Sequence, residues 1–200
     1  MKAKASSPRP PVDRRKPILY GTLAVIAIAL VVTVGVLSRN PSVVPQSATE
    51  THTQSTLKMG DDAPPFAVST TAGPFDLAAA KTPVLLEVFA TWCPHCQRET
   101  KTLDDLYKRF GKQITFVAVS GSNVGADGNT PASQADVIAF AQKYDVTYPV
   151  AFDPDLKVAN LYLESGFPTI VVIKANKKVS YLADGEISAS ILESAIKAAL

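Results

Sequence analysis

The chain has two cysteines, and they stand three positions apart in the segment Trp92-Cys93-Pro94-His95-Cys96. Two thiols at this spacing can pass between a dithiol and a disulfide, which is the chemistry of thiol-disulfide exchange. If the pair opens a helix, the first sulfur lies beside unsatisfied backbone N–H groups and the positive end of the helix dipole, and both favour its thiolate. Cys93 is therefore predicted to be the exposed nucleophile, and Cys96 the thiol that resolves a mixed disulfide.

The residues around the two cysteines suit this chemistry. Pro94 fits the first turn of a helix, and His95 can stabilise a neighbouring thiolate by charge or by a hydrogen bond. Trp92 has two interpretations: it packs beside the active-site surface and shields the sulfurs, or it belongs to the core.

Other uses of the cysteine pair are less consistent with the sequence. A structural disulfide across four residues would remove little entropy from the unfolded chain. A zinc site needs about four ligands, and the chain supplies no second cysteine pair and, besides His95, only the remote His52. Two inert buried cysteines are seldom placed at this spacing. We therefore expect no metal, and no cofactor other than the redox-active disulfide between Cys93 and Cys96.

The segments on either side of the cysteines predict the elements that position them. Residues 84–89, VLLEVF, form an almost continuous apolar run that is typical of a central buried strand. After the cysteines, four apolar residues with helical spacing predict an amphipathic helix that Gly111 can close. They are Leu103, Leu106, Tyr107 and Phe110. Residues 114–119 predict a second central strand.

Strand and helix patterns alternate from Lys58 to the end of the chain, and they predict an α/β fold in which helices flank a central mixed sheet. Thr130 and Pro131 are predicted as the N-cap and first residue of a helix, and Ser190 and Glu193 have capping-box spacing for the last helix. The other predicted elements are a hairpin over 66–75, a glycine-rich loop over 121–129, a short strand over 148–152, a short helix over 156–163 and a hairpin over 170–183.

Two motifs together resemble the active-site halves of the thioredoxin superfamily. They are Trp92-Cys93-Pro94-His95-Cys96 after a buried strand and Gly166-Phe167-Pro168-Thr169 before another. The resemblance covers residues 58–200. The pattern Gly60-x-x-Ala63-Pro64-x-Phe66, the apolar N-terminal segment and the insert before Ser133 are similar to the TlpA and ResA branch. That branch includes membrane-tethered proteins that reduce apocytochrome c for haem attachment.

The resemblance implies roles for residues outside the cysteine motif. Pro168 would be a cis-proline that faces the cysteines, the alternative being an ordinary trans turn proline. The backbone of Phe167 would pair with an extended client, and Thr169 would complete this substrate-binding segment.

Glu87 is the charged residue inside the apolar run of residues 84–89. An unpaired carboxylate is costly there, and the resemblance places a buried acid behind the resolving cysteine. Burial should raise the pKa of Glu87, which would let it accept the proton of Cys96 during resolution. The alternative is a partly exposed structural acid paired with a lysine.

The direction of electron transfer stays open in the sequence. The TlpA and ResA resemblance implies a reductase, whereas Pro94-His95 is the dipeptide of the oxidising DsbA-like proteins, whose large helical insertion is missing here. Two other functions compete. One is a peroxiredoxin-like peroxidase, although such a site has Thr-x-x-Cys and Thr91 stands only two residues before Cys93. The other is a non-catalytic thioredoxin-fold binding or chaperone module.

The first 57 residues predict an appendage in three parts. Residues 18–37 carry no charge and are mostly apolar, which is about the 20 residues that a transmembrane helix needs. Residues 1–17 form a basic tail, and residues 38–57 form a flexible linker to the thioredoxin-like domain of residues 58–200. A cleavable signal peptide is the competing interpretation, but its apolar region usually runs about 7 to 15 residues.

The charges predict the orientation of this appendage. Residues 1–57 carry seven basic and two acidic groups, a net charge of +5, and residues 58–200 carry thirteen and sixteen, a net charge of −3. A basic flank stays on the cytoplasmic side, so we expect a single-pass cell-membrane protein with an extracytoplasmic catalytic domain and no role in nucleic-acid binding. Its substrates would be the thiols and disulfides of exported proteins, in cytochrome c maturation or oxidative folding, and a membrane redox partner would recharge it.

Overall fold

Three strands, each formed by a mostly apolar run of the sequence, lie at the centre of the sheet. The computed structural model describes residues 56–200, and in it β3 (Val84–Phe89) pairs in parallel with β4 (Thr115–Ser120) and antiparallel with β6 (Thr169–Ile173). Every residue of β3 and β6 is buried, as continuous apolar runs require of strands covered on both faces. The mixed sheet that was predicted is therefore confirmed.

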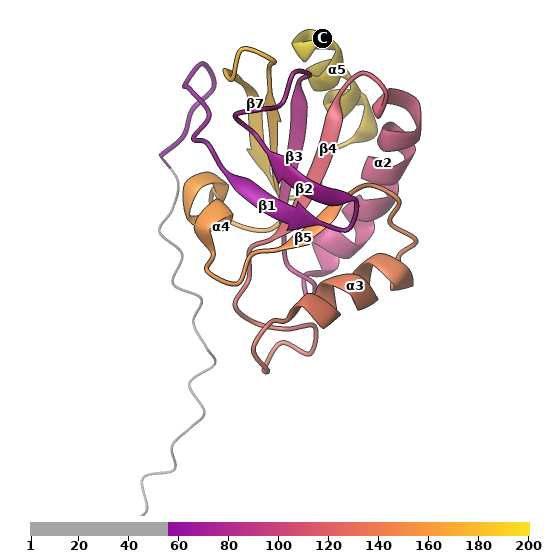
Figure 1. Ribbon diagram of the computed structural model, residues 1–200. Helices are drawn as coiled ribbons and strands as arrows, with labels where there is room; N and C mark the ends of the chain where they lie inside the picture. Colours follow the sequence, from indigo (N-terminus) through magenta and orange to yellow (C-terminus); the bar gives the residue numbers. More distant parts are fainter. Residues whose placement is uncertain (1–55) are drawn as a thin grey trace, which may run out of the picture. The chain divides into compact units, whose positions relative to one another are not determined.

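Shorter strands extend the sheet on both sides, giving the order β2-β1-β5-β4-β3-β6-β7. The predicted early hairpin is formed by β1 (Ala67–Thr70) and β2 (Gly73–Asp76), and β1 pairs antiparallel with β5 (Val150–Phe152). The predicted C-terminal hairpin is β6 with β7 (Val179–Asp184). Figure 1 shows these strands running through the middle of the described residues, with helices on both sides.

Alternation along β3 sends its side chains to two different cores. Leu85 and Phe89 lie in the core beneath α2 (Pro94–Phe110), α3 (Gln134–Lys143) and α5 (Ala189–Ala199). Leu86 and Val88 lie in the opposite core, beneath the short helix α4 (Lys157–Tyr162). Since successive strand residues point to opposite faces, Glu87 shares the α2 face with Leu85 and Phe89.

Two predicted helix starts are wrong. Helix α3 begins after Ser133 rather than at Thr130 and Pro131, because Ser133 and Asp136 form a reciprocal capping box. Pro131 instead forms an isolated bridge with Val124.

The last helix α5 begins after Ser188, without the predicted box between Ser190 and Glu193. The Glu193 carboxylate bonds to Arg109 at 2.5 Å and to Lys197 at 2.7 Å instead, so these ion pairs replace the cap. Gly111 does end α2 as predicted, in right-handed rather than left-handed conformation.

The predicted basic tail (1–17), transmembrane helix (18–37) and nearly all of the linker (38–57), with His52, lie outside the described residues. Within residues 56–200, no helix has both the length and the apolar character needed to cross a bilayer.

Gly121 follows the end of β4 and lies very close to Val88 of β3 and to Ala159 of α4. A Cβ at this position would lie 2.6 Å from Cγ1 of Val88 and 2.7 Å from Cβ of Ala159, so the backbone would have to move. We expect Gly121→Ala to lower the free energy of unfolding by about 1–3 kcal/mol, as overpacking does. Urea denaturation measures this. Gly166→Ala is the control, because its Cβ would meet nothing within 4 Å; equal stability of the two variants would contradict the prediction.

Candidate active site

The cysteine segment joins the end of β3 to the start of α2. Cys93 is the N-cap residue, with extended backbone angles of φ −76° and ψ 119°, and Pro94 opens the helix as predicted. The Cys93 N–H donates to the carbonyl of Ala90 at 3.1 Å, while its own carbonyl accepts from the N–H of Gln97 at 3.1 Å. This leaves the sulfur beside the free N–H groups of the first helical turn, which favour an anion.

The Cys93 sulfur is a stabilised thiolate at neutral pH. Its pKa is lowered to about 6, first by a hydrogen bond from the Cys96 thiol, then by the backbone N–H groups of Cys96 and His95 and by the charge of His95. Burial opposes these effects. The prediction of an exposed sulfur is wrong: Cys93 is only 4% exposed, and its sulfur lies 3.5 Å from the carbonyl oxygen of Phe167.

Cys96 differs from Cys93 in the direction in which the pKa of its thiol is shifted. It is fully buried, and its pKa is raised far above the ordinary value by that burial, by its hydrogen bond to Cys93 and by the charge of Glu87. The two cysteines form no disulfide with each other in this structure. A thiol is a poor nucleophile, so Cys96 can attack only after a neighbouring base has taken its proton.

Glu87 is a buried carboxyl group on the same face of the sheet. It is 2% exposed, and its pKa is raised to about 8, mainly by burial and then by the charge of Glu99, while a 3.4 Å hydrogen bond from the Tyr148 hydroxyl opposes the rise. Its Oε1 has no hydrogen-bond partner among the described residues. The alternative of an exposed acid paired with a lysine is therefore wrong, and a carboxyl group that titrates near neutral pH can accept the proton of Cys96.

The loop before β6 faces Cys93. The Phe167–Pro168 peptide bond is cis, as predicted, and it presents the Phe167 carbonyl to the Cys93 sulfur. Thr169 is fully buried; its hydroxyl donates to the Gly166 carbonyl at 2.9 Å and accepts from the Glu164 N–H at 3.2 Å. The side chain of Thr169 thus closes the loop, which corrects its assignment to client binding.

Trp92 links the active-site loop to the insert after β4. Its Nε1–H donates to the Ser122 hydroxyl at 2.9 Å, and its ring packs edge-on against the Phe167 ring with 6.0 Å between centroids. Trp92 is half-buried: it packs against the core and also borders the active site, so both predicted roles apply to it.

Sequence reasoning missed a second buried acid, Glu99. It is 3% exposed, its Oε2 accepts from the Ile187 N–H at 3.1 Å, and its pKa is raised to about 7, mainly by burial. Its signal was available, because it stands three residues after Cys96 and hence on the same face of α2.

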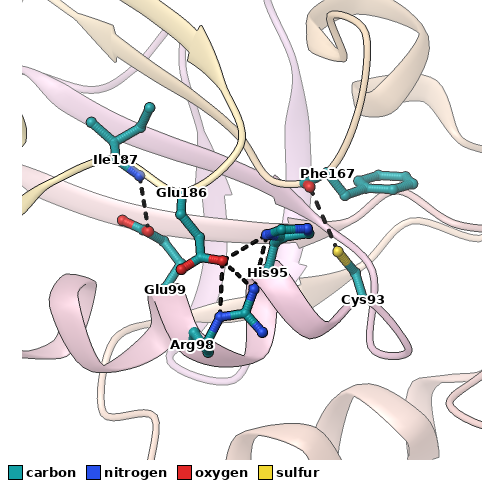
Figure 2. A network of polar contacts seen from close by, with 7 residues as sticks. All are labelled: Cys93, His95, Arg98, Glu99, Phe167, Glu186 and Ile187. Atoms are coloured by element: carbon teal, nitrogen blue, oxygen red, sulfur yellow. Dashed lines mark hydrogen bonds and ion pairs between the residues drawn. The ribbon is translucent and has the colours of Figure 1, made fainter.

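The charged rim of the site was also missed. The Glu186 carboxylate, on the loop between β7 and α5, contacts His95 Nδ1 at 2.6 Å and Arg98 Nε at 2.9 Å, and it contacts Arg98 Nη2 as well (Figure 2). Arg98 Nη2 lies 2.9 Å from His95 Nδ1. No sequence pattern brings Glu186 to this place, because 91 residues separate it from His95.

Among residues 56–200, no three His, Cys, Asp or Glu side chains are grouped so that they could hold a metal ion.

Comparison with known proteins gives a consistent result. Residues 59–182, more than half of the chain, match the AhpC/TSA family. The thiol-disulfide oxidoreductase ResA of Bacillus subtilis is 32% identical over 139 residues, which cover 68% of this chain and 73% of ResA. ResA of Oceanobacillus iheyensis is 28% identical over 145 residues, 68% of this chain and 70% of that protein.

Solved structures agree with these relatives. A Chlorobium tepidum protein assigned as the thiol:disulfide interchange protein DsbE superposes with a TM-score of 0.61 at 30% identity, covering 72% of this chain and 99% of that one. StoA of Bacillus subtilis has a TM-score of 0.56 at 18% identity over 66% of this chain and 96% of its own, and it shares the fold.

Glutamine in place of Glu87 tests whether the carboxyl titrates as its burial indicates. A raised pKa means that the folded protein holds the proton more tightly than the unfolded chain, so Glu87 destabilises the fold increasingly as the pH rises from about 4.5 to about 8. The slope for one such group is at most about 1.4 kcal/mol per pH unit. We expect Glu87→Gln to flatten the fall in unfolding free energy over this range, measured by urea denaturation of the reduced protein.

Glu193→Gln is the matched control for this measurement. Its pKa is lowered by Lys197 and Arg109, so its contribution to stability is lost only when the pH falls below the ordinary carboxyl range. A Glu87→Gln profile as steep as that of the parent protein would show that Glu87 does not carry a raised pKa.

Proposed function

Because the chain belongs to the thioredoxin-like AhpC/TSA family, we propose that it is a membrane-anchored, extracytoplasmic enzyme that reduces disulfides in exported proteins. The chain is a thiol-disulfide oxidoreductase of the ResA and DsbE type. The alternative of a non-catalytic module is therefore set aside. The peroxidase alternative is supported only by the family match. A peroxidase site would also need an arginine beside the reactive cysteine, and Arg98 instead binds Glu186 and His95 at the rim.

The observation that carries the proposal is the difference between the two sulfurs. Cys93 has a pKa of about 6 and borders the cis-proline loop, whereas Cys96 is buried and protonated. One sulfur is thus ready to attack a client, and the other is kept in reserve.

The exchange proceeds in two steps that conserve electrons. The Cys93 thiolate attacks one sulfur of a client disulfide, and the other client sulfur leaves as a thiolate. Cys96 then gives its proton to the ionised form of Glu87 and attacks the Cys93 sulfur of the mixed disulfide, which releases the second client thiolate. The client gains two electrons and Cys93–Cys96 becomes a disulfide, which a membrane dithiol partner must reduce again.

Reduction is the direction that the thiolate energetics favour. A Cys93 pKa of about 6 lies nearer to the pKa of about 7 in thioredoxin than to the value of about 3.5 in DsbA. Oxidation of clients is the second candidate, and the observation in its favour is that His95 stabilises the Cys93 thiolate.

The location and the clients are proposed on different grounds. Residues 18–37 have the length and composition of a membrane anchor, and the basic residues before them favour a cytoplasmic N-terminus. The resemblance of the sequence motifs to the TlpA and ResA branch supports apocytochrome c as one client class, and exported proteins undergoing oxidative folding are the other.

The reduction potential decides between the two directions. We expect a value nearer to the about −270 mV of thioredoxin than to the about −120 mV of DsbA. The full chain would be equilibrated in dithiothreitol and glutathione buffers, with the fluorescence of Trp92, its single tryptophan, as the readout. A value close to that of DsbA would overturn the reductive assignment and support oxidation.

Trapping identifies the clients and the compartment. In the full chain, Cys96→Ala should accumulate mixed disulfides through Cys93, because the resolving thiol is absent. We expect these complexes in the membrane fraction, sensitive to dithiothreitol and formed with exported proteins. Cys93→Ala should form none. Complexes with cytoplasmic proteins, or complexes equally abundant with Cys93→Ala, would contradict the proposal.

A further inference from the structure

A three-residue charged cluster ties the active-site helix to the loop after β7. It consists of His95 and Arg98, on the first turns of α2, and Glu186 between β7 and α5. All three meet at a single oxygen, Oε1 of Glu186. The side chains are 58%, 55% and 37% exposed respectively, so the cluster forms a surface rim rather than part of the core.

The contacts at His95 Nδ1 are in competition. If Nδ1 carries a hydrogen, it donates to Glu186 at 2.6 Å; if it does not, it can only accept from Arg98 Nη2 at 2.9 Å. The Glu186 carboxylate is well suited to the first arrangement, because contacts with Arg98 and His95 hold its pKa below the ordinary value and keep it ionised. Without Glu186, the remaining partner of Nδ1 would be a donor.

His95 connects this cluster to the reacting sulfur. Its backbone N–H and its charge both stabilise the Cys93 thiolate. In Figure 2 the imidazole turns its Nδ1 edge toward Glu186 and Arg98, and Cys93 lies beyond the opposite edge. An imidazole held by Nδ1–H is thus kept beside Cys93.

We propose that Glu186 is a positioning residue for thiol-disulfide exchange. It holds the His95 imidazole by Nδ1–H beside Cys93, stabilises the thiolate of the reduced enzyme and so raises the reduction potential of the Cys93–Cys96 pair. Arg98 keeps the carboxylate of Glu186 ionised and in place. The inference rests on exchange at Cys93 and holds for either direction of electron flow.

Other titratable groups also face this region, and the test has to separate them. Glu99, on α2, accepts a hydrogen bond from the N–H of Ile187, the residue directly after Glu186. The pKa of Tyr181, on β7, is raised by burial and by the charge of Glu99. Glu87 and Cys96 lie behind Cys93. Glu186→Gln keeps the length of the side chain and leaves each of these groups in place, but it also removes a charge that contributes to the raised pKa of Glu99. An effect that reaches Cys93 through Glu99 would persist without His95, so a His95→Ala background separates the two routes.

The sign of the change in Cys93 is the decisive result. Removing a negative charge acts directly through space to lower the pKa of the Cys93 thiol. Loss of the contact between Glu186 and His95 Nδ1 should raise the Cys93 pKa, because His95 would no longer be held beside the thiolate. We expect Glu186→Gln to raise the Cys93 pKa by about half a unit, the size typical of a surface ion pair, and to make oxidation of a reference dithiol about threefold less favourable.

The experiment uses the full chain in detergent, with the thiolate absorbance of Cys93 and the dithiothreitol equilibrium as readouts. In a His95→Ala background, Glu186→Gln should no longer raise the Cys93 pKa. Glu193→Gln is the matched control, because it removes an equally charged acid of α5 that binds Lys197 and Arg109. Arg109 stands about 24 Å along α2 from Cys93, so this variant should change neither readout.

Two outcomes would overturn the inference. One is a Cys93 pKa that is unchanged or lowered in Glu186→Gln. The other is a rise that persists without His95. Both readouts are measured on purified protein without a client, so failure here leaves the trapping result, and hence the proposed client class and compartment, unaffected.

Discussion

The hydrogen bond from the buried Cys96 thiol to the Cys93 sulfur is the interaction on which the rest of the site depends. It is the largest cause of the lowered Cys93 pKa, and after burial it is the next cause of the raised pKa of Cys96. This contact and the burial of Cys96 together give two chemically identical residues opposite pKa shifts. The fold supplies it by ending β3 directly before α2, so that the first sulfur caps the helix and the second lies one turn inside it.

Keeping Cys96 protonated requires a dry environment, and the acids behind it share that environment. Glu87 and Glu99 are both almost fully buried, each has a carboxylate oxygen without a partner among the described residues, and each raises its pKa mainly through burial. Such groups cost stability when they ionise. Beside two reactive sulfurs, however, acids with raised pKa values are functionally useful. A carboxyl group that titrates near neutral pH can both take and return a proton.

The predictable part of this site is the part encoded by local sequence. The run VLLEVF specifies a buried strand and places Glu87 by simple alternation, and the Cys-Pro-His-Cys spacing specifies a helix start. The exposure of Cys93 could not be read in this way, because the Phe167 carbonyl that lies against it comes from a loop 74 residues away. Glu186 is hidden for the same reason. The start of α3 was misjudged because two adjacent capping signals competed, and the reciprocal contact of Ser133 with Asp136 decided between them.

The buried part and the rim of the site contribute to exchange in different ways. Glu87 acts on a proton that must move in both directions of exchange, so it alters how fast the disulfide forms and breaks. Its charge also raises the pKa of the Cys96 thiol in the reduced enzyme. His95 acts on the thiolate that exists only when the enzyme is reduced, so it alters the equilibrium itself. Relatives can therefore share the fold, the buried cysteine and the cis-proline while differing in potential. In this chain the buried Cys96 is the largest cause of the lowered Cys93 pKa, and the charge of His95 adds to it; His95 is the residue that the Glu186 cluster holds at the rim.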